Sequence, residues 1–136
     1  MCYYLKRTKF LRIYIFMRAL LHTYSETELT KLLCEGEDTL AKSVFAELYD
    51  RFERRIYAYC LRVTGCRDDA GDITQETFIT FYRVARSKFI DQPSAYLLIT
   101  ARNKCLNFKR DRTSYEQLYE ETVASESTKN SYEQKD

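Results

Sequence analysis

Four residues between positions 72 and 79 could form a surface that binds a protein partner. Asp72, Gln75, Glu76 and Ile79 follow the spacing i, i+3, i+4, i+7, which places them on one face of a helix. Carboxylates and an amide at this spacing can accept bidentate hydrogen bonds from arginine side chains. The alternative is a solvated face whose early carboxylates favour the positive end of the helix dipole. Acid–base or metal chemistry is poorly supported, because no histidine, second acidic cluster or nucleophile lies nearby in the sequence.

A second set of residues has the side-chain chemistry of a nucleic-acid contact. Its members recur at i, i+4, i+7, i+11 and i+14, with Lys104 beside them: Tyr96, Thr100, Asn103, Asn107 and Arg110. An aromatic ring can stack on an unpaired base, amides can bond base edges, and cations can hold phosphates. The alternative is an ordinary amphipathic helix with a cationic C-terminal end, which the helix dipole also favours. Two asparagines in such a helix cost about 1 kcal/mol relative to alanine, which argues for a function.

Four helices should position these two faces. A capping box, Ser25-Glu-Thr-Glu28, opens a short helix that Gly36 closes. A one-sided apolar stripe predicts a second helix over 39–64, with Gly65 after it. A third is expected from Asp68 or Asp69 to about 86, and a fourth from Pro93 to about 112. No segment alternates with period two for long enough to form a sheet. The expected fold is therefore all-α, a compact bundle of about four helices.

The apolar stripes also predict which residues of the last three helices face the core. These residues are Phe45, Leu48, Tyr49, Phe52, Ile56, Tyr59, Cys60 and Val63; Ile73, Phe78, Phe81, Tyr82 and Ala85; and Leu97, Leu98, Ala101, Cys105 and Phe108.

Composition and charge divide the 136 residues into three parts. Three Gly and one Pro argue against a turn-rich all-β fold, and 45% hydrophobic residues suffice for one core. Residues 1–22 carry five basic and no acidic residues, and are predicted to be a loose, basic and apolar extension. Residues 23–112 hold the helical domain; within it, 23–91 has net charge −3 and 92–112 has +4. Residues 113–136 carry two basic and six acidic residues, and are predicted to be a linker or disordered tail.

Several other functions receive little support from the sequence. Phe10–Leu21 is apolar, but it is short and interrupted by Arg12 and Arg18, so no membrane insertion is expected. Because the organised sequence begins just after Met17, translation could start there, which would make residues 1–16 non-native. Three of the five cysteines fall on apolar stripes and are expected in the core: Cys34, Cys60 and Cys105. A zinc site built from Cys60, Cys66 and His22 lacks any recognised spacing, so no metal or cofactor is predicted.

Together the two helices resemble a known family. Phe45–Arg112 is similar to region two of bacterial RNA polymerase sigma factors of the extracytoplasmic-function type. The strings that carry the resemblance are Phe-Ala-Glu-Leu-Tyr-Asp-Arg-Phe (45–52), Asp-Ile-Thr-Gln-Glu-Thr-Phe (72–78), Ser-Ala-Tyr-Leu-Leu-Ile-Thr-Ala-Arg-Asn (94–103) and Lys-Arg-Asp-Arg (109–112). The three longer strings occur in the family's order, which makes the resemblance specific.

The resemblance implies a cytoplasmic, non-enzymatic promoter-recognition domain with two partners. In the family the acidic helix docks on the clamp coiled coil of the polymerase β′ subunit, a role that passes to the face of Asp72, Gln75, Glu76 and Ile79. The basic helix binds the −10 element as the strands separate, a role that passes to Tyr96 and Asn103, and then to Thr100, Lys104, Asn107 and Arg110. The loop 89–92, with Phe89 and Asp91, corresponds to the loop that accepts a flipped base. An anti-sigma factor is a further candidate partner.

Departures from the family leave the function open. Gly71 stands where the family has Glu or another helix former, and Tyr96 replaces the commoner Trp. Nothing after Thr113 resembles the region-four domain with its helix-turn-helix, so the chain is expected to be a fragment or to work with region two alone. The first hypothesis is a transcription initiation factor that binds core polymerase and melts the −10 element. The alternative is a polymerase-binding module that competes with full sigma factors without initiating. A third is a generic helical scaffold without affinity for β′.

Overall fold

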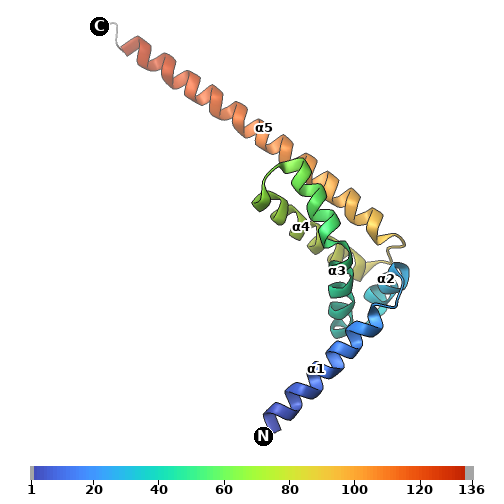
Figure 1. Ribbon diagram of the computed structural model, residues 1–136. Coiled ribbons are helices and arrows are strands. Elements are labelled where there is room, and N and C mark those ends of the chain that lie inside the picture. Colours follow the sequence, from blue (N-terminus) through green and yellow to red (C-terminus); the bar gives the residue numbers. More distant parts are fainter. Residues whose placement is uncertain (1, 134–136) are drawn as a thin grey trace.

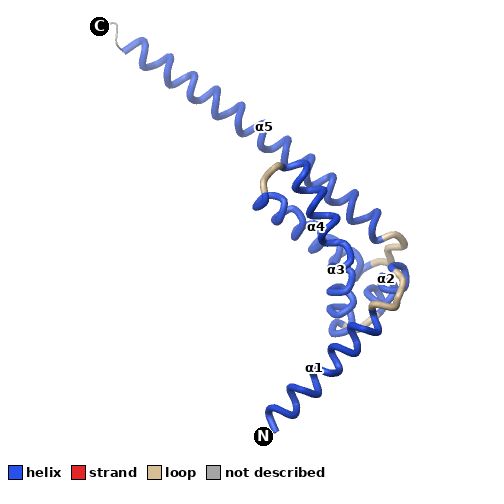
Figure 2. The backbone as a smooth tube through the Cα atoms, viewed as in Figure 1, coloured by secondary structure: helices blue, strands red, loops and turns tan. Residues whose placement is uncertain are grey.

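The computed structural model describes residues 2–133, which form five helices and, within that range, no strand (Figures 1 and 2). The helices are α1 (Cys2–Leu21), α2 (Glu26–Glu35), α3 (Asp38–Thr64), α4 (Arg67–Ser87) and α5 (Pro93–Glu133). Side chains are described for residues 7–127. The helices α2, α3, α4 and the first half of α5 form the bundle, while α1 and the second half of α5 project at opposite ends (Figure 1). This confirms the all-α prediction.

Local sequence signals set the ends of the bundle helices. Ser25 and Glu28 form the predicted capping box: the Glu28 amide donates to Ser25 Oγ at 3.2 Å, and the Ser25 amide donates to Glu28 Oε2 at 2.8 Å. Gly65 ends α3 with φ = 71°, a left-handed conformation that glycine adopts without steric cost. Pro93 is the first residue of α5, where an amide hydrogen would have no helical partner.

The core consists of the apolar stripes predicted on α3, α4 and α5, with α2 closing one side. Leu29, Leu33 and Leu48 are fully buried, and each such side chain contributes about 1.5–3 kcal/mol through removal from water. An aromatic group joins α3 to α4: the rings of Phe45 and Tyr82 lie 5.0 Å apart, and those of Tyr49 and Phe78 lie 4.6 Å apart. These contacts hold α4 against α3, and α4 also packs on α2 and α5.

The thiols of Cys60 and Cys105 also belong to this core, as predicted from the apolar stripes. Both side chains are fully buried, and Cys34 is partly buried. Burial, with a smaller effect of the neighbouring Cys60, raises the pKa of Cys105 to about 12. No group of His, Cys, Asp or Glu within the described residues could hold a metal ion.

Two arginines tie helices together through backbone carbonyls that the helix ends leave open. Arg86 of α4 donates through Nη1 to the carbonyl oxygens of Leu33 and Gly36 at 2.8 and 2.7 Å, and through Nη2 to Asp38. Arg51 of α3 donates to the carbonyl oxygens at the end of α1, which are those of Leu21, His22 and Tyr24. Neither arginine lies on an apolar stripe, so helical periodicity in the sequence predicts neither role.

The structure corrects two local predictions. The helix expected to end near residue 112 continues to Glu133, and residues 2–21, predicted to be loose, form α1. No Gly or Pro interrupts 94–133, and an i, i+4 pair between Arg112 and Glu116 at 3.2 Å supports the continuation. Residues 134–136 of the predicted disordered tail lie outside the described residues.

Although α5 is longer than predicted, its packed part is not. Every described side chain from Lys109 to residue 127 is exposed. The last side chain that contacts the core is Phe108. No helix of the described chain is long and apolar enough to cross a bilayer.

Candidate functional site

The predicted acidic face forms one continuous exposed surface on α4. Asp72, Gln75, Glu76 and Ile79 are all exposed, and Ile79 keeps 54% of its surface in contact with water. The opposite side of α4 is buried through Ile73, Thr74, Thr77, Phe78 and Phe81. The two buried threonines donate their hydroxyls to carbonyl oxygens four residues earlier, each at 2.7 Å, so no polar atom is left unpaired there. The helix therefore holds the four residues on a firmly packed base.

An apolar hollow lies beside this face, between α3 and α4. Two adjoining cavities share Phe45 and Ile79. The first is about 280 Å³ and is also lined by Lys42 and Tyr82; the second is about 370 Å³ and is also lined by Tyr49, Gly71, Gln75 and Phe78. Ile79 thus stands between the acidic residues and an apolar depression. Exposed apolar surface and carboxylates therefore lie side by side on this part of α4.

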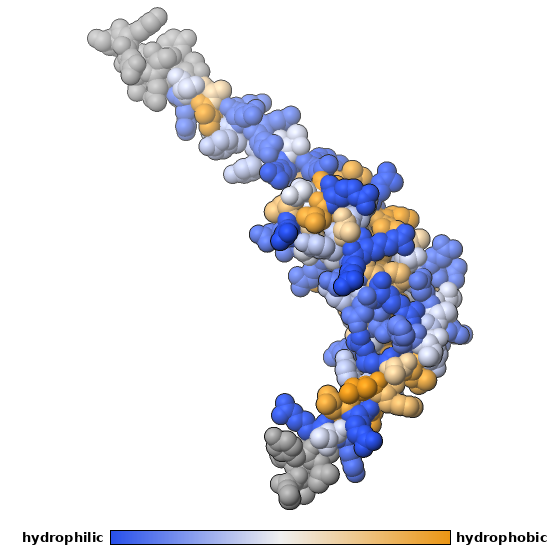
Figure 3. All heavy atoms as spheres, viewed as in Figure 1, coloured by the Kyte–Doolittle hydropathy of each residue, from blue (hydrophilic) through white to orange (hydrophobic). Residues whose placement is uncertain are grey.

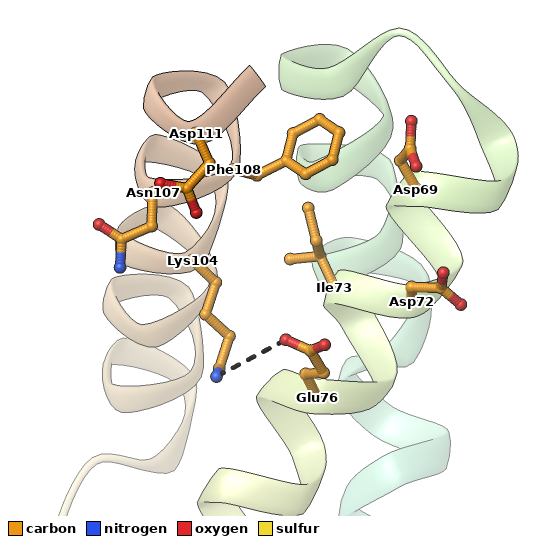
Figure 4. Close-up of a pocket in the computed structure, with 8 residues that line it drawn as sticks. All are labelled: Asp69, Asp72, Ile73, Glu76, Lys104, Asn107, Phe108 and Asp111. Atoms are coloured by element: carbon orange, nitrogen blue, oxygen red, sulfur yellow. Dashed lines mark ion pairs between the residues drawn. The ribbon is translucent and has the colours of Figure 1, made fainter. Parts of the chain in front are cut away.

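A third cavity of about 350 Å³ separates α4 from α5 (Figure 4). In Figure 4 the side chains of Ile73 and Phe108 point into the space between the two helices, and Lys104 reaches toward Glu76. The Lys104 Nζ lies 3.9 Å from Glu76 Oε2, and the Glu76 side chain is 66% exposed. Such an exposed pair contributes little to stability, so a partner's cation can replace Lys104 at low cost.

Two carboxylates outside the predicted site also line this cavity. Asp69 of α4 and Asp111 of α5 line it together with Asp72, Glu76 and Asn107. The signal for Asp69 was present in the sequence, because Asp69, Asp72 and Glu76 follow i, i+3, i+7 on one helix. The position of Asp111 depends on how α4 and α5 pack, and periodicity within either helix does not predict that.

The predicted nucleic-acid face on α5 has an exposed part and a partly buried part. Asn103, Asn107 and Arg110 are exposed and, with Leu106, line a shallow hollow of about 560 Å³. The Arg110 guanidinium donates to Asn107 Oδ1. Tyr96 and Thr100 are partly buried, and the Tyr96 ring lies 6.0 Å from that of Phe81. Tyr96 therefore offers only part of its ring to a ligand.

The loop before α5 presents the remaining predicted residues. Phe89 is 48% exposed and Asp91 is exposed, while Ile90 between them is buried and anchors the loop. The Asp91 carbonyl oxygen accepts a hydrogen bond from Thr27 Oγ1 of α2 at 3.3 Å. From Tyr96 to Arg110 the helix rises about 21 Å. We call the predicted residues from the loop 89–92 to Arg110 the track.

Comparison with known proteins gives one match. A family model described as Sigma-70 region 2 matches residues 48–115, which cover most of α3, all of α4 and the packed half of α5. No curated protein and no solved structure matches the chain. The matched segment includes both the acidic face of α4 and the track along α5.

Proposed function

We propose that this chain, which belongs to the sigma-70 region 2 family, is a transcription initiation factor of the extracytoplasmic-function type. Region 2 of sigma factors takes part in binding core RNA polymerase and in recognising the promoter −10 element, and it is not an enzyme family. The observation that carries the proposal is the presence of two exposed faces of different chemistry on adjacent helices, one acidic on α4 and one amide-rich and basic on α5.

The face on α4 suits the β′ clamp coiled coil. Asp72, Gln75 and Glu76 offer acceptors that arginines on a partner helix can engage in pairs. Ile79 and the apolar hollow beside Phe45 offer a place for an aliphatic side chain of the same helix. In Figure 4, Asp72 projects from the side of α4 that faces away from Lys104, so this carboxylate keeps its acceptors for a partner.

The track on α5 suits an unpaired DNA strand. Asn103 and Asn107 are exposed and can reach base edges, while Lys104 and Arg110 lie close enough to hold phosphates. The exposed ring of Phe89 in the preceding loop can stack on a base, and Asp91 can accept a hydrogen bond from a base amino group. We include Tyr96 and Thr100 in this surface as a secondary, half-buried part.

Binding to core polymerase tests the first face. The double variant Asp72→Ala/Glu76→Ala should weaken binding to cognate core enzyme by at least 10-fold, because charge-assisted hydrogen bonds at an interface are worth about 1.5–3 kcal/mol each. The matched control is Asp68→Ala, which removes an exposed carboxylate of the same helix outside the cavities described above. Equal affinity of the double variant and the control in a fluorescence titration would count against the proposal.

Selection of single-stranded DNA tests the second face. With the wild-type complex of chain and core enzyme, a randomised single strand should yield an enriched motif. Asn103→Ala should lose preference at one position of that motif. Lys104→Ala and Arg110→Ala should weaken binding to all sequences and each lower the salt slope by about 0.7. Gln117→Ala, beyond the track, serves as the control. An unchanged motif and unchanged salt slopes would remove α5 from the DNA interface.

One observation favours the alternative function, a polymerase-binding module that blocks full sigma factors. Tyr96 is packed against Phe81, so only part of its ring is available to stack on a base. The acceptors of the acidic face on α4 are exposed. Run-off transcription with cognate core enzyme separates the two functions. Promoter-specific product supports the initiation factor, whereas inhibition of a resident sigma factor without product supports the competitor.

A further inference from the structure

The apolar stripe that packs α5 into the bundle continues after the bundle ends. Leu97, Ala101, Cys105 and Phe108 contact the core at helical spacing. The same stripe continues through Tyr115, Leu118, Tyr119 and Val123, with 70%, 63%, 63% and 46% of their surfaces exposed. An apolar stripe of four large residues is unusual for a solvated helix and indicates a surface that a partner covers. We call residues 113–127 of α5 the acidic extension, because their charged residues are all glutamates.

The other projecting helix, α1, has complementary properties. Phe10, Ile13 and Phe16 are 77%, 64% and 72% exposed, and Figure 3 shows hydrophobic surface beside hydrophilic surface at the α1 end of the molecule. Residues 1–22 carry five basic and no acidic residues, and 113–136 carry six acidic and two basic residues. One helix is apolar and basic, and the other is apolar and acidic.

These two helices cannot meet within one chain. The bundle holds α1 and the acidic extension at opposite ends of the molecule, pointing away from each other (Figure 1). The end of α1 is fixed to α3 by the three Arg51 hydrogen bonds and by the ion pair of Arg18 with Asp50. The acidic extension is continuous with the packed half of α5. A partner for either helix must come from another molecule.

We propose that the partner is a second copy of this chain, and that α1 of each copy packs on the acidic extension of the other. Charge selects this pairing: two α1 helices would bring basic residues together, and two acidic extensions would bring glutamates together. A lipid surface is the weaker match, because it could cover basic α1 but not the acidic extension, whose exposed apolar residues lie among glutamates that an anionic bilayer repels. The inference does not rest on the proposed function.

Charge reversal in the full-length chain tests the pairing. One variant carries Arg7→Glu, Lys9→Glu and Arg12→Glu in α1; the other carries Glu116→Lys, Glu121→Lys and Glu126→Lys in the acidic extension. By analytical ultracentrifugation the wild type should self-associate below ~100 µM, a weak to moderate affinity. Each variant alone should associate at least ten-fold more weakly, and an equimolar mixture should recover association, because both cross-pairs are again complementary.

A matched control reverses three exposed arginines of α3 instead: Arg54→Glu, Arg55→Glu and Arg62→Glu. This control should self-associate as the wild type does, and circular dichroism confirms that each variant keeps its helix content. The proposal is overturned by a wild type that stays monomeric, by a mixture that does not recover association, or by unchanged association of either single variant. A monomeric wild type that binds phosphatidylglycerol vesicles through α1 would assign that helix to a membrane surface instead.

Discussion

At the scale of single residues, the buried carboxylate of Glu47 fixes how α1 meets the bundle. Its Oε1 accepts a hydrogen bond from Arg51 Nε at 2.9 Å and lies 3.0 Å from His22 Nδ1. Only 5% of the Glu47 side chain is exposed, and no buried side-chain polar atom of the described residues lacks a partner. Glu47 holds the Arg51 guanidinium where it binds the carbonyl oxygen of the last α1 residue and two carbonyl oxygens just after the helix. A buried charge that is fully hydrogen-bonded positions its neighbours more than it adds to stability.

The Glu47 carboxylate should make stability depend on pH. Burial acts to raise its pKa, but the hydrogen bonds from Arg51 and His22 outweigh burial and lower the pKa below the usual value of 4.5. A lowered pKa contributes stability above the unfolded pKa, and that contribution is lost as pH falls through the folded pKa. Glu47→Gln should therefore lose about 1–3 kcal/mol at pH 7, where a neutral amide replaces the charged acceptor. At pH values below the folded pKa it should match the wild type more closely.

Urea unfolding at pH 7 and at pH 3 measures this effect. Glu35→Gln is the control, since that glutamate is exposed on α2. A difference between Glu47→Gln and wild type that is the same at both pH values would contradict the assigned role of the carboxylate.

Residue spacing predicted the faces of this protein better than it predicted individual contacts. Asp72, Gln75, Glu76 and Ile79 were placed on one helix face from i, i+3, i+4, i+7 spacing alone, and all four are exposed together. Glu47 and Arg51 gave no such signal, because a Glu and an Arg four residues apart usually form a solvated pair. Their burial depends on His22 and on the end of α1, more than 20 residues away in sequence.

At the scale of elements, two glycines at helix positions should have opposite effects on stability. Gly71 lies inside α4, where an added Cβ would meet no atom within 4 Å. Gly71→Ala should stabilise the protein by about 0.5–1 kcal/mol, because alanine loses less backbone entropy in a helix. Gly65 has φ = 71° after α3, so Gly65→Ala should destabilise it by about 1–2 kcal/mol. Chemical denaturation compares the two with wild type, and a loss of stability in Gly71→Ala would mean that α4 needs its backbone freedom there.

Caps and periodicity predicted the bundle helices, but they did not predict where α5 ends. The capping box at Ser25 and the glycine at 65 appear where expected because each depends on a few neighbouring residues. The polar composition after Thr113 suggested the end of the helix, yet composition alone does not break a helix that contains neither Gly nor Pro. The stripe of Tyr115, Leu118, Tyr119 and Val123 was the signal for continuation.

At the scale of the whole molecule, the segments of strongest net charge are distributed between the bundle and its two ends. The bundle from α2 to Phe108 holds nearly all buried side chains and includes most of the basic segment 92–112, while a second basic segment, α1, and the acidic segment 113–136 lie at its ends. The acidic face and the α5 track lie on the bundle itself, on either side of the α4–α5 cavity. Substitutions in the projecting helices can therefore test the proposed self-association, and substitutions in the bundle can test the proposed binding, each without changing the other surface.

Removal of residues 113–136 should leave the bundle intact. Every described side chain from Lys109 to 127 is exposed. At low concentration the free energy of unfolding of the shortened chain should therefore lie within about 0.5 kcal/mol of that of the wild type. At high concentration the wild type should melt at a higher temperature, because association stabilises the folded state by mass action, whereas the shortened chain should show no such rise. Thermal unfolding monitored by circular dichroism over a hundred-fold dilution series measures both.

The control is a chain ending at Ala101, which lacks the core side chains of Cys105 and Phe108 and should not fold. A chain ending at Arg112 that also failed to fold would mean that the acidic extension stabilises the bundle from which it projects.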